Sequence, residues 1–432
     1  MILSALQQFF LACWFFLSLV GLFSTYLYSY QNLNYSHSLT LFPSEKPGSL
    51  VTTLGLDWNP QPILGIHYFG DFQSIIGESI LFDSNFNYYT VDISDSPFTY
   101  FLGMILANLS DAIGLSTTFF SLLIIVLTAI YLRAFSYSHN LWLSFWIFVI
   151  SISSMGLLFA VDRGNFWLIS GLFVYLGSYS RWTRKQDIVY LALAIAIKPP
   201  LIILAFLIII RNREYRKIFT IATVFLIIQA TSLVFLLSTL RIQTIYLQMY
   251  SYFFNIITAY FSRSDTFLSY PTPPNHLGIR TSLRLLLEES SLFDSNLFWK
   301  FIEIFVIALT LGVFLGLLKI SLSNNSNFIT LILGTSILIT YFLGGNGYSL
   351  IILISGIAIL FSQESAKDST IRPVSNVEVV TLALCSCPIF IPFAFKFGNP
   401  TFLTFIIPIL MISIIFCNLF KFSEGKFLKS SS

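Results

Sequence analysis

The sequence predicts an all-α, polytopic membrane protein with about 12 transmembrane helices. Hydrophobic residues make up 56% of the chain and charged residues only 10%, against about 25% charged residues in an average soluble protein. Apolar runs recur from end to end, and most are long enough to cross a hydrocarbon core of about 30 Å. Only helices and closed barrels span lipid, and these runs lack the alternation of barrel strands.

The predicted spans follow the apolar runs in order. They cover residues 3–29, 115–134, 141–159, 165–180, 187–197, 199–210, 218–240, 300–319, 327–343, 347–362, 377–396 and 399–420. The first run is too long for a signal-peptide core and lacks a small-residue cleavage site, so we expect an uncleaved helix. Segments 187–197 and 199–210 are too short to cross alone, and they flank Lys198-Pro199-Pro200. We therefore expect the chain to turn within the membrane there, where such backbone must be buried in protein or line a cavity.

The basic residues of the short loops predict the orientation, because cytoplasmic loops carry an excess of Lys and Arg. They form three groups: Arg181, Arg184 and Lys185; Arg211, Arg213, Arg216 and Lys217; and Lys421, Lys426 and Lys429. All three groups lie inside if both termini are cytoplasmic. The outer face then holds loops 30–114 and 241–299, the turns at Asp162 and Lys198, and the turn 344–347.

An apolar segment at 97–112 needs a separate interpretation. If it crossed the membrane, the Arg-rich loops would be inverted. We therefore expect a partly embedded helix on the outer surface.

These features predict a single integral membrane domain over residues 1–432. Residues 1–240 form a first module whose outer loop, 30–114, carries amphipathic helices, and residues 241–432 form a second module with outer loop 241–299. The net charge of +3 gives no sign of nucleic-acid binding, since the positive residues are topology signals. The cysteines lie inside apolar runs and predict neither a disulfide framework nor a metal site, and no cofactor is expected. They are Cys13, Cys385, Cys387 and Cys417.

The two long outer loops carry different charges. Loop 30–114 has a single lysine, Lys46, and a larger set of acids: Glu45, Asp57, Asp71, Glu78, Asp83, Asp92, Asp95 and Asp111. Loop 241–299 holds several cations: Arg241, Arg263, His276, Arg280 and Arg284. Long loops without structure are uncommon unless they carry function. In the predicted orientation the two loops face each other on the same side of the membrane. An acid of the first loop could act as a general base, and the cations of the second could hold a phosphate. This arrangement predicts an enzyme that acts on a phosphorylated lipid.

Asp71 is the predicted catalytic residue, in the role of general base. It stands in His67-Tyr68-Phe69-Gly70-Asp71-Phe72, where Gly70 allows close approach of the backbone. A helical apolar spacing follows, at Phe72, Ile75, Ile76 and Ile80. The alternative is a solvated loop acid. Asp92 is a further candidate from the same loop.

Lys198 is the predicted ligand of a phosphate. Pro199 and Pro200 break the helix beside it. A compact, strongly hydrated ammonium at such a break suits a lipid-linked phosphate. The alternative is a lysine that packs its stem among neighbours and extends its amine to the interface.

The turn Asp162-Arg163-Gly164-Asn165 is the second predicted phosphate site. Charges at membrane depth are costly, so this Asp–Arg pair is a functional candidate. Arg163 would either make bidentate contacts with phosphate or pair internally with Asp162. Gly164-Asn165 opens the next helix, whose free amides would favour an anion.

Three further candidates lie in the second half of the chain. His276 and Arg280, in loop 241–299, are predicted to add phosphate contacts, although a lone loop histidine is usually only solvated. Tyr348 follows the outer turn 344–347.

The order of these motifs resembles glycosyltransferase family 87, the polyprenyl-phosphate-sugar-dependent membrane enzymes of the GT-C fold, which include bacterial mannosyltransferases. The Gly-Asp of that family is matched by Gly70-Asp71, and its Tyr/Pro-rich element before an apolar helix by Ser96-Pro97-Phe98-Thr99-Tyr100. Its Gly and Asn at a helix start are matched by Gly164-Asn165, and its Lys-Pro by Lys198-Pro199. The resemblance covers roughly residues 65–220.

The resemblance implies an inverting transfer of mannose or a similar hexose or pentose from a polyprenyl-phosphate donor to a lipid or glycan acceptor. The reaction would take place on the extracytoplasmic face of a bacterial inner membrane, with Asp71 as the base. Two departures concern the acceptor and the sugar. Ser96-Pro97-Phe98 stands where the family has Tyr-Pro-Pro, and the turn that ends at Tyr348 lacks the histidine often found there.

Two other functions fit the same helices. A multi-pass transporter or flippase of lipid-linked or polar solutes would also explain the broken helix at Lys198 and the buried charges. It would not need a long acidic outer loop, and the sequence shows no inverted repeat. A polymerase or ligase of lipid-linked glycans would share the donor chemistry but use a different acceptor.

The orientation can be tested by labelling introduced cysteines with a membrane-impermeant maleimide in intact cells, after replacing the native cysteines. We expect labelling beside Asp71 and at Gly345, and no labelling beside Lys185, because short basic loops are retained in the cytoplasm. Permeabilised cells provide the control for reagent access. Labelling beside Lys185 in intact cells would overturn the assignment of the outer face.

Overall fold

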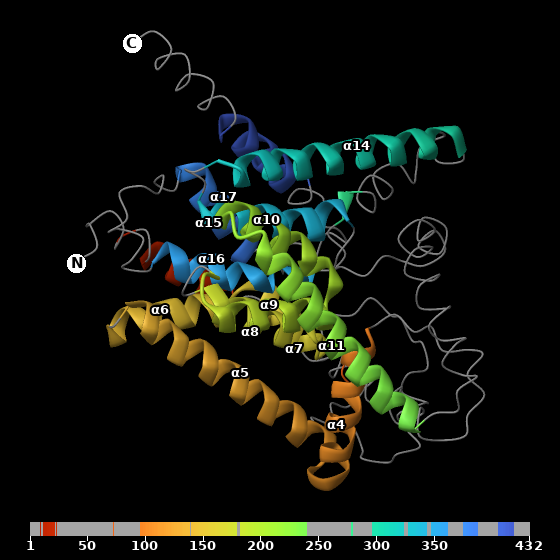
Figure 1. Cartoon of the computed structure of the whole chain (residues 1–432). Helices are drawn as coiled ribbons and strands as arrows, with labels where there is room; N and C mark the ends of the chain where they lie inside the picture. Colours follow the sequence, from red (N-terminus) through yellow and green to blue (C-terminus); the bar gives the residue numbers. More distant parts are fainter. Residues whose placement is uncertain are drawn as a thin grey trace.

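In the computed structural model, all regular elements of the described part of the chain are helices (Figure 1). The described residues are 9, 12–21, 23, 72, 96–138, 140–178, 182–239, 278–279, 296–323, 327–343, 347–361, 375–387 and 405–418. For these residues the all-α prediction is confirmed.

The helices lie close to the predicted spans. In chain order they are Ala12–Gly21, α4 (Pro97–Ile113), α5 (Leu115–Ser138), α6 (Leu141–Ile152), α7 (Met155–Arg163), α8 (Trp167–Ser178), α9 (Lys185–Ile197), η2 (Pro199–Leu201), α10 (Ile202–Asn212), α11 (Arg216–Thr239), α14 (Asn296–Ser321), α15 (Phe328–Ile337), the π-helix η3 (Leu338–Phe342), η4 (Gly347–Ile352), α16 (Leu353–Leu360), α17 (Asn376–Ser386) and Phe405–Asn418.

One predicted span, 141–159, is not a single helix. The chain breaks between α6 and α7, where Ser154 has extended backbone (φ −66°, ψ 142°). Serine hydroxyls bond to helix carbonyls just before the break: Ser151 Oγ to Ile147 and Ser153 Oγ to Val149, both at 2.7 Å. Such side-chain bonds compete with the helix ladder and favour its end.

Three helices in the described part of the chain are long and apolar enough to cross a membrane. They are Thr117–Ser136, Arg216–Phe235 and Lys300–Ser321. The other apolar helices are shorter, such as Pro199–Asn212 and Phe328–Phe342. The chain is thus an integral membrane protein, while the count of about 12 crossings stays a prediction.

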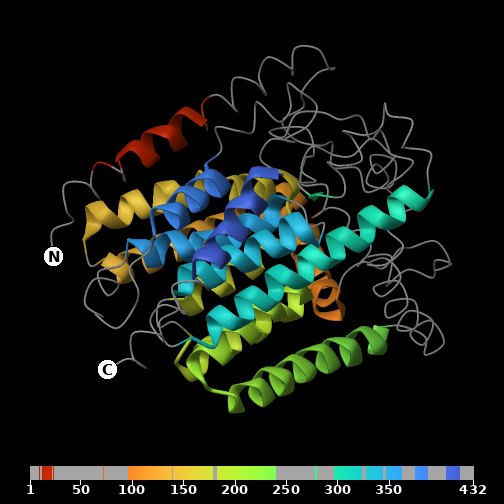
Figure 2. The ribbon, with the colours of Figure 1, turned by 90° about the horizontal axis from the view of Figure 1, so that it is seen from above.

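The buried centre of the protein is formed by α15 and α16. Every residue of α15 is buried, and so are residues 353–359 of α16. A helix that is apolar all round belongs inside a bundle. In Figure 1, α16 and α15 lie between α14 and the pair α8 and α9, and α4 runs across the direction of α14 at the edge of the molecule. From above, in Figure 2, α14 and α11 flank this bundle on one side.

Glycines allow α7 and α8 to approach η4 closely. A Cβ atom on Gly156 would lie 2.2 Å from the backbone nitrogen of Ile351 and 2.4 Å from the carbonyl carbon of Leu350. A Cβ atom on Gly171 of α8 would lie 2.7 Å from Cγ2 of the same Ile351. Ile351 therefore packs between two helices at positions where only glycine leaves room.

Replacing Gly156 by alanine should lower the stability of the protein. The new methyl group would meet backbone atoms, so η4 must shift, and overpacking of this kind costs about 1–3 kcal/mol. The matched control is Gly312→Ala in α14, where no atom lies within 4 Å of the new Cβ. Thermal unfolding in detergent should show a lower midpoint for Gly156→Ala alone. Equal midpoints for the two variants would contradict the close contact.

Candidate functional site

The first element of the candidate site is the start of α4. Ser96 caps this helix with extended backbone (φ −73°, ψ 155°), and its Oγ accepts a hydrogen bond from the amide of Thr99 at 3.3 Å. Pro97 follows at the first helical position, where its missing N–H leaves no helix bond unmade. The Ser-Pro pair therefore sets where α4 begins.

The second element is the break between α9 and α10. In a helix the amide of each residue donates to the carbonyl four residues earlier. The carbonyl of Ala196 would thus need the amide of residue 200, which is a proline, and the carbonyl of Ile197 would need the amide of Leu201. Proline has no N–H to donate. The amide of Leu201 donates instead to the carbonyl of Lys198, at 3.1 Å. Helix α9 thus ends with carbonyl groups that need partners from elsewhere.

Side chains from α4 and α11 supply these partners. Ser96 Oγ donates to the carbonyl of Ala196, and Gln229 Nε2 donates to the same oxygen at 2.9 Å. Thr99 Oγ1 donates to the carbonyl of Ile197 at 3.2 Å. Ser96 and Thr99 are both buried. Two other helices therefore hold the end of α9 and the turn that follows it.

Lys198 itself lies at this turn. It caps α9 with extended backbone (φ −129°, ψ 92°), and its amide still donates to the carbonyl of Ala194 at 2.9 Å. The side chain is partly exposed. The predicted break in the helix at Lys198 is confirmed.

The third element is the turn between α7 and α8. Gly164 ends α7 in the left-handed region (φ 63°), which favours glycine. Asn165 is buried, and its Oδ1 accepts from the amide of Trp167 at 2.9 Å. The next three amides donate to the carbonyls of Asn165 and Phe166; they belong to Leu168, Ile169 and Ser170. The amides of residues 167–170 thus have partners within the turn, and the predicted anion site at this helix start stays a prediction.

An aromatic cluster joins the three elements. Phe72, which follows Asp71 in the chain, is 1% exposed. Its ring lies 5.3 Å from that of Phe119 and 6.2 Å from that of Phe166, which directly precedes α8. Ile197, at the end of α9, belongs to the same cluster. Three residues of this cluster, Phe72, Phe166 and Ile197, are thus the sequence neighbours of the predicted site positions 71, 165 and 198.

The remaining predicted site residues are distributed as follows. Asp162 and Arg163 form the end of α7, and Tyr348 lies in η4, which packs against α7. The other candidates lie outside the described residues: Asp71, Asp92, His276 and Arg280.

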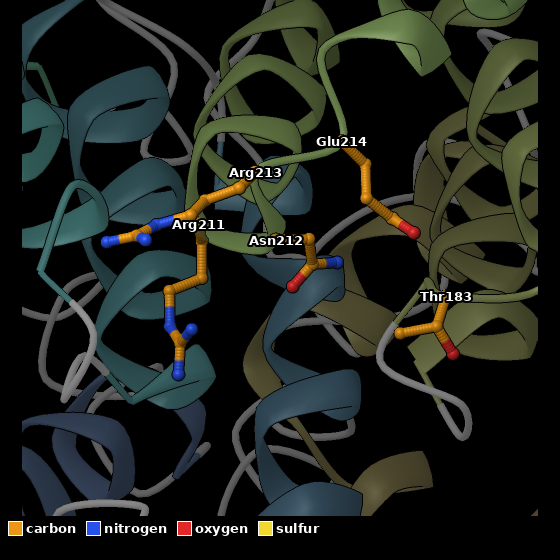
Figure 3. A pocket seen from close by; sticks show the side chains of 5 residues that line it. All are labelled: Thr183, Arg211, Asn212, Arg213 and Glu214. Carbon is orange, nitrogen blue, oxygen red and sulfur yellow. The ribbon is translucent and has the colours of Figure 1, made fainter.

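The opposite end of α9 and α10 carries basic loops. Lys217 forms an ion pair with Glu214, and its Nζ donates to the carbonyl of Thr183 at 2.7 Å. This bond ties the turn before α9 to the turn before α11. The two turns border an open depression of about 400 Å³ (Figure 3). Its lining residues are Thr183, Arg211, Asn212, Arg213 and Glu214. Two of the predicted basic loops therefore share one end of the bundle, one helix length away from Lys198.

The sequence was compared with known families and proteins. The profile of glycosyltransferase family 87 matches residues 96–343. The chain belongs to glycosyltransferase family 87. It is therefore a glycosyltransferase of the membrane, and its family argues against the transporter interpretation. The comparisons with curated proteins and with solved structures found no match.

The matched residues change the extent of the resemblance seen in the sequence. The match starts at Ser96, the cap of α4, and runs through α14 and α15 rather than ending near residue 220. All three structural elements of the candidate site lie within it. Gly70-Asp71 precedes the matched residues, so the role of Asp71 does not rest on the family match.

The bonds that hold the Lys198 turn were not predicted from the sequence. In the sequence Ser96 and Thr99 stand out only as parts of a motif, and no motif contains Gln229. A signal for Gln229 did exist, since it lies in a segment with mean hydropathy 2.2. A polar amide in such a helix is expected to have a hydrogen-bond partner on a neighbouring helix.

Proposed function

We propose that this glycosyltransferase moves a sugar from a polyprenyl-phosphate donor to a lipid or glycan acceptor on the extracytoplasmic face of the membrane. One observation carries the proposal. In a chain of family 87, the start of α4, the Asn165 turn and the Lys198 turn meet around the buried Phe72. These elements come from three separate parts of the sequence, and the predicted site residues are next to them.

Lys198 is the proposed ligand of the donor phosphate. The phosphate is the leaving group, and it gains charge as the bond to the sugar breaks. A fixed cation next to that oxygen stabilises the transition state more than the ground state. Arg163, the last residue of α7, is proposed to add a second cation, and His276 and Arg280 of loop 241–299 are proposed to add further contacts.

Asp71 is the proposed general base. In the reaction the acceptor hydroxyl gives its proton to the carboxylate as its oxygen forms a bond to the anomeric carbon. The bond from that carbon to the phosphate oxygen breaks, and polyprenyl phosphate leaves. A single displacement of this kind inverts the anomeric centre. It needs one positioned base, and Asp71 is the proposed one because it directly precedes the buried Phe72 in the chain.

The proposal is tested by supplying membranes that contain the protein with a radiolabelled polyprenyl-phosphate mannose and following the label into lipid and glycan fractions. Transfer is expected above the level of membranes without the protein. Transfer only to a preassembled lipid-linked oligosaccharide would favour a polymerase or ligase. If polyprenyl-phosphate donors give no transfer while nucleotide sugars do, the proposed donor is wrong.

Asp71→Asn should lower turnover about 10²- to 10⁴-fold, the usual contribution of a general base. The substitution keeps the volume of the side chain and removes only the base, so donor binding should change little. Asp83→Asn, in the same loop, is the matched control. A variant that keeps near wild-type turnover would exclude Asp71 as the base, and Asp92 would be examined next.

Lys198→Met should weaken use of the donor about ten- to more than hundredfold, because a charge-assisted hydrogen bond contributes about 1.5–3 kcal/mol. Methionine fills similar space in an apolar setting, so the fold should persist. Lys198→Arg should recover only part of the activity, since a planar fork does not replace a compact ammonium. Unchanged donor affinity in Lys198→Met would move the phosphate site elsewhere, most directly to Arg280 and His276.

A further inference from the structure

Gln229 is the polar residue of α11 that meets both other helices at the Lys198 turn. Its Nε2 donates to the carbonyl of Ala196 in α9, at 2.9 Å. Its Oε1 accepts from the amide of Phe98 in the first turn of α4, at 3.2 Å. One side chain thus uses both ends of its amide to connect three helices.

Both partners of Gln229 are backbone groups that no helix bond can satisfy. The carbonyl of Ala196 has lost its helix partner to Pro200. The amide of Phe98 lies in the first turn of α4, where amides have no partner within the helix. Within a membrane no water is available to bond to such groups. The side chain that bonds to both of them therefore fixes the geometry of the turn at Lys198.

We propose that Gln229 is a positioning residue that acts through Lys198: by holding the end of α9, it places the lysine for contact with the donor phosphate. The proposal rests on the proposed function, in which Lys198 binds that phosphate. Gln229 itself does not touch the donor. Removing it should therefore shift the lysine from its working position and leave the rest of the donor site in place.

A double-mutant cycle separates this role from a general effect on folding. The variants are Gln229→Met, Lys198→Met and the combination of both, assayed for kcat/KM with the polyprenyl-phosphate donor. Gln229→Met alone should lower kcat/KM about tenfold, the effect of misplacing a charge-assisted contact. In the double variant it should add little to the loss caused by Lys198→Met, because the lysine through which it acts is already gone.

The matched control is Thr231→Val, which removes a hydroxyl from an exposed position of the same helix and should leave kcat/KM unchanged. Gln229→Asn is the second variant. Its amide is one methylene shorter and cannot reach both partners, so it should lose activity in the same direction as Gln229→Met. It also keeps the cycle usable if the methionine variant does not fold.

Hydrogen exchange gives a readout that does not depend on the assay of activity. The backbone amide of Leu201, which donates to the carbonyl of Lys198, should exchange its hydrogen faster in Gln229→Met than in Thr231→Val. Suppose that the wild-type protein uses the donor. If the losses in kcat/KM of Gln229→Met and Lys198→Met then multiply in the double variant, the positioning role is overturned while the proposed function stands. Unchanged hydrogen exchange at the turn in Gln229→Met would lead to the same conclusion. If wild-type protein uses no polyprenyl-phosphate sugar, the proposed function itself fails.

Discussion

Two consecutive prolines in an apolar part of the chain impose the constraint on which the candidate site depends. Pro200 removes the amide that Ala196 would need, and water is not available to replace it within a membrane. The structure satisfies the exposed carbonyls with Ser96 and Thr99 of α4 and Gln229 of α11. These two helices therefore stabilise the break. The start of α4, the end of α9 and the middle of α11 are distant in the sequence, and they meet at this break beside Lys198.

Small residues fix the other half of the site in a different way. Gly156 and Gly171 let α7 and α8 close on the same residue of η4, Ile351. The turn between α7 and α8 is then held by bonds within itself, through Gly164 and Asn165. Hydrogen bonds to the end of a broken helix thus hold one side of the site in place. Close packing against glycine residues holds the other side in place.

Much of this architecture could be predicted from the sequence, because hydropathy and proline positions act locally. The helical spans and the break at Lys198 follow from such local signals, whereas the family was indicated by a resemblance in the order of its motifs. The division of span 141–159 could not be predicted, because it depends on how serine hydroxyls bond to the backbone at Ser153. The bonds made by the amides of residues 167–170 could not be predicted, because a motif shows where a helix starts but not which backbone groups have partners. Gln229 shows the largest gap, since its partners lie 131 and 33 residues away in the sequence.

The most direct test of the central claim is photo-crosslinking of wild-type protein with a polyprenyl-phosphate analogue that carries a diazirine next to the phosphate. Peptides that bear the label are then mapped by mass spectrometry. If the donor phosphate binds where three helices meet, the label should be found on peptides that contain the start of α4, the Asn165 turn or the Lys198 turn, and excess unlabelled donor should suppress it. Labelling concentrated at the Arg211 end of the bundle would contradict the account.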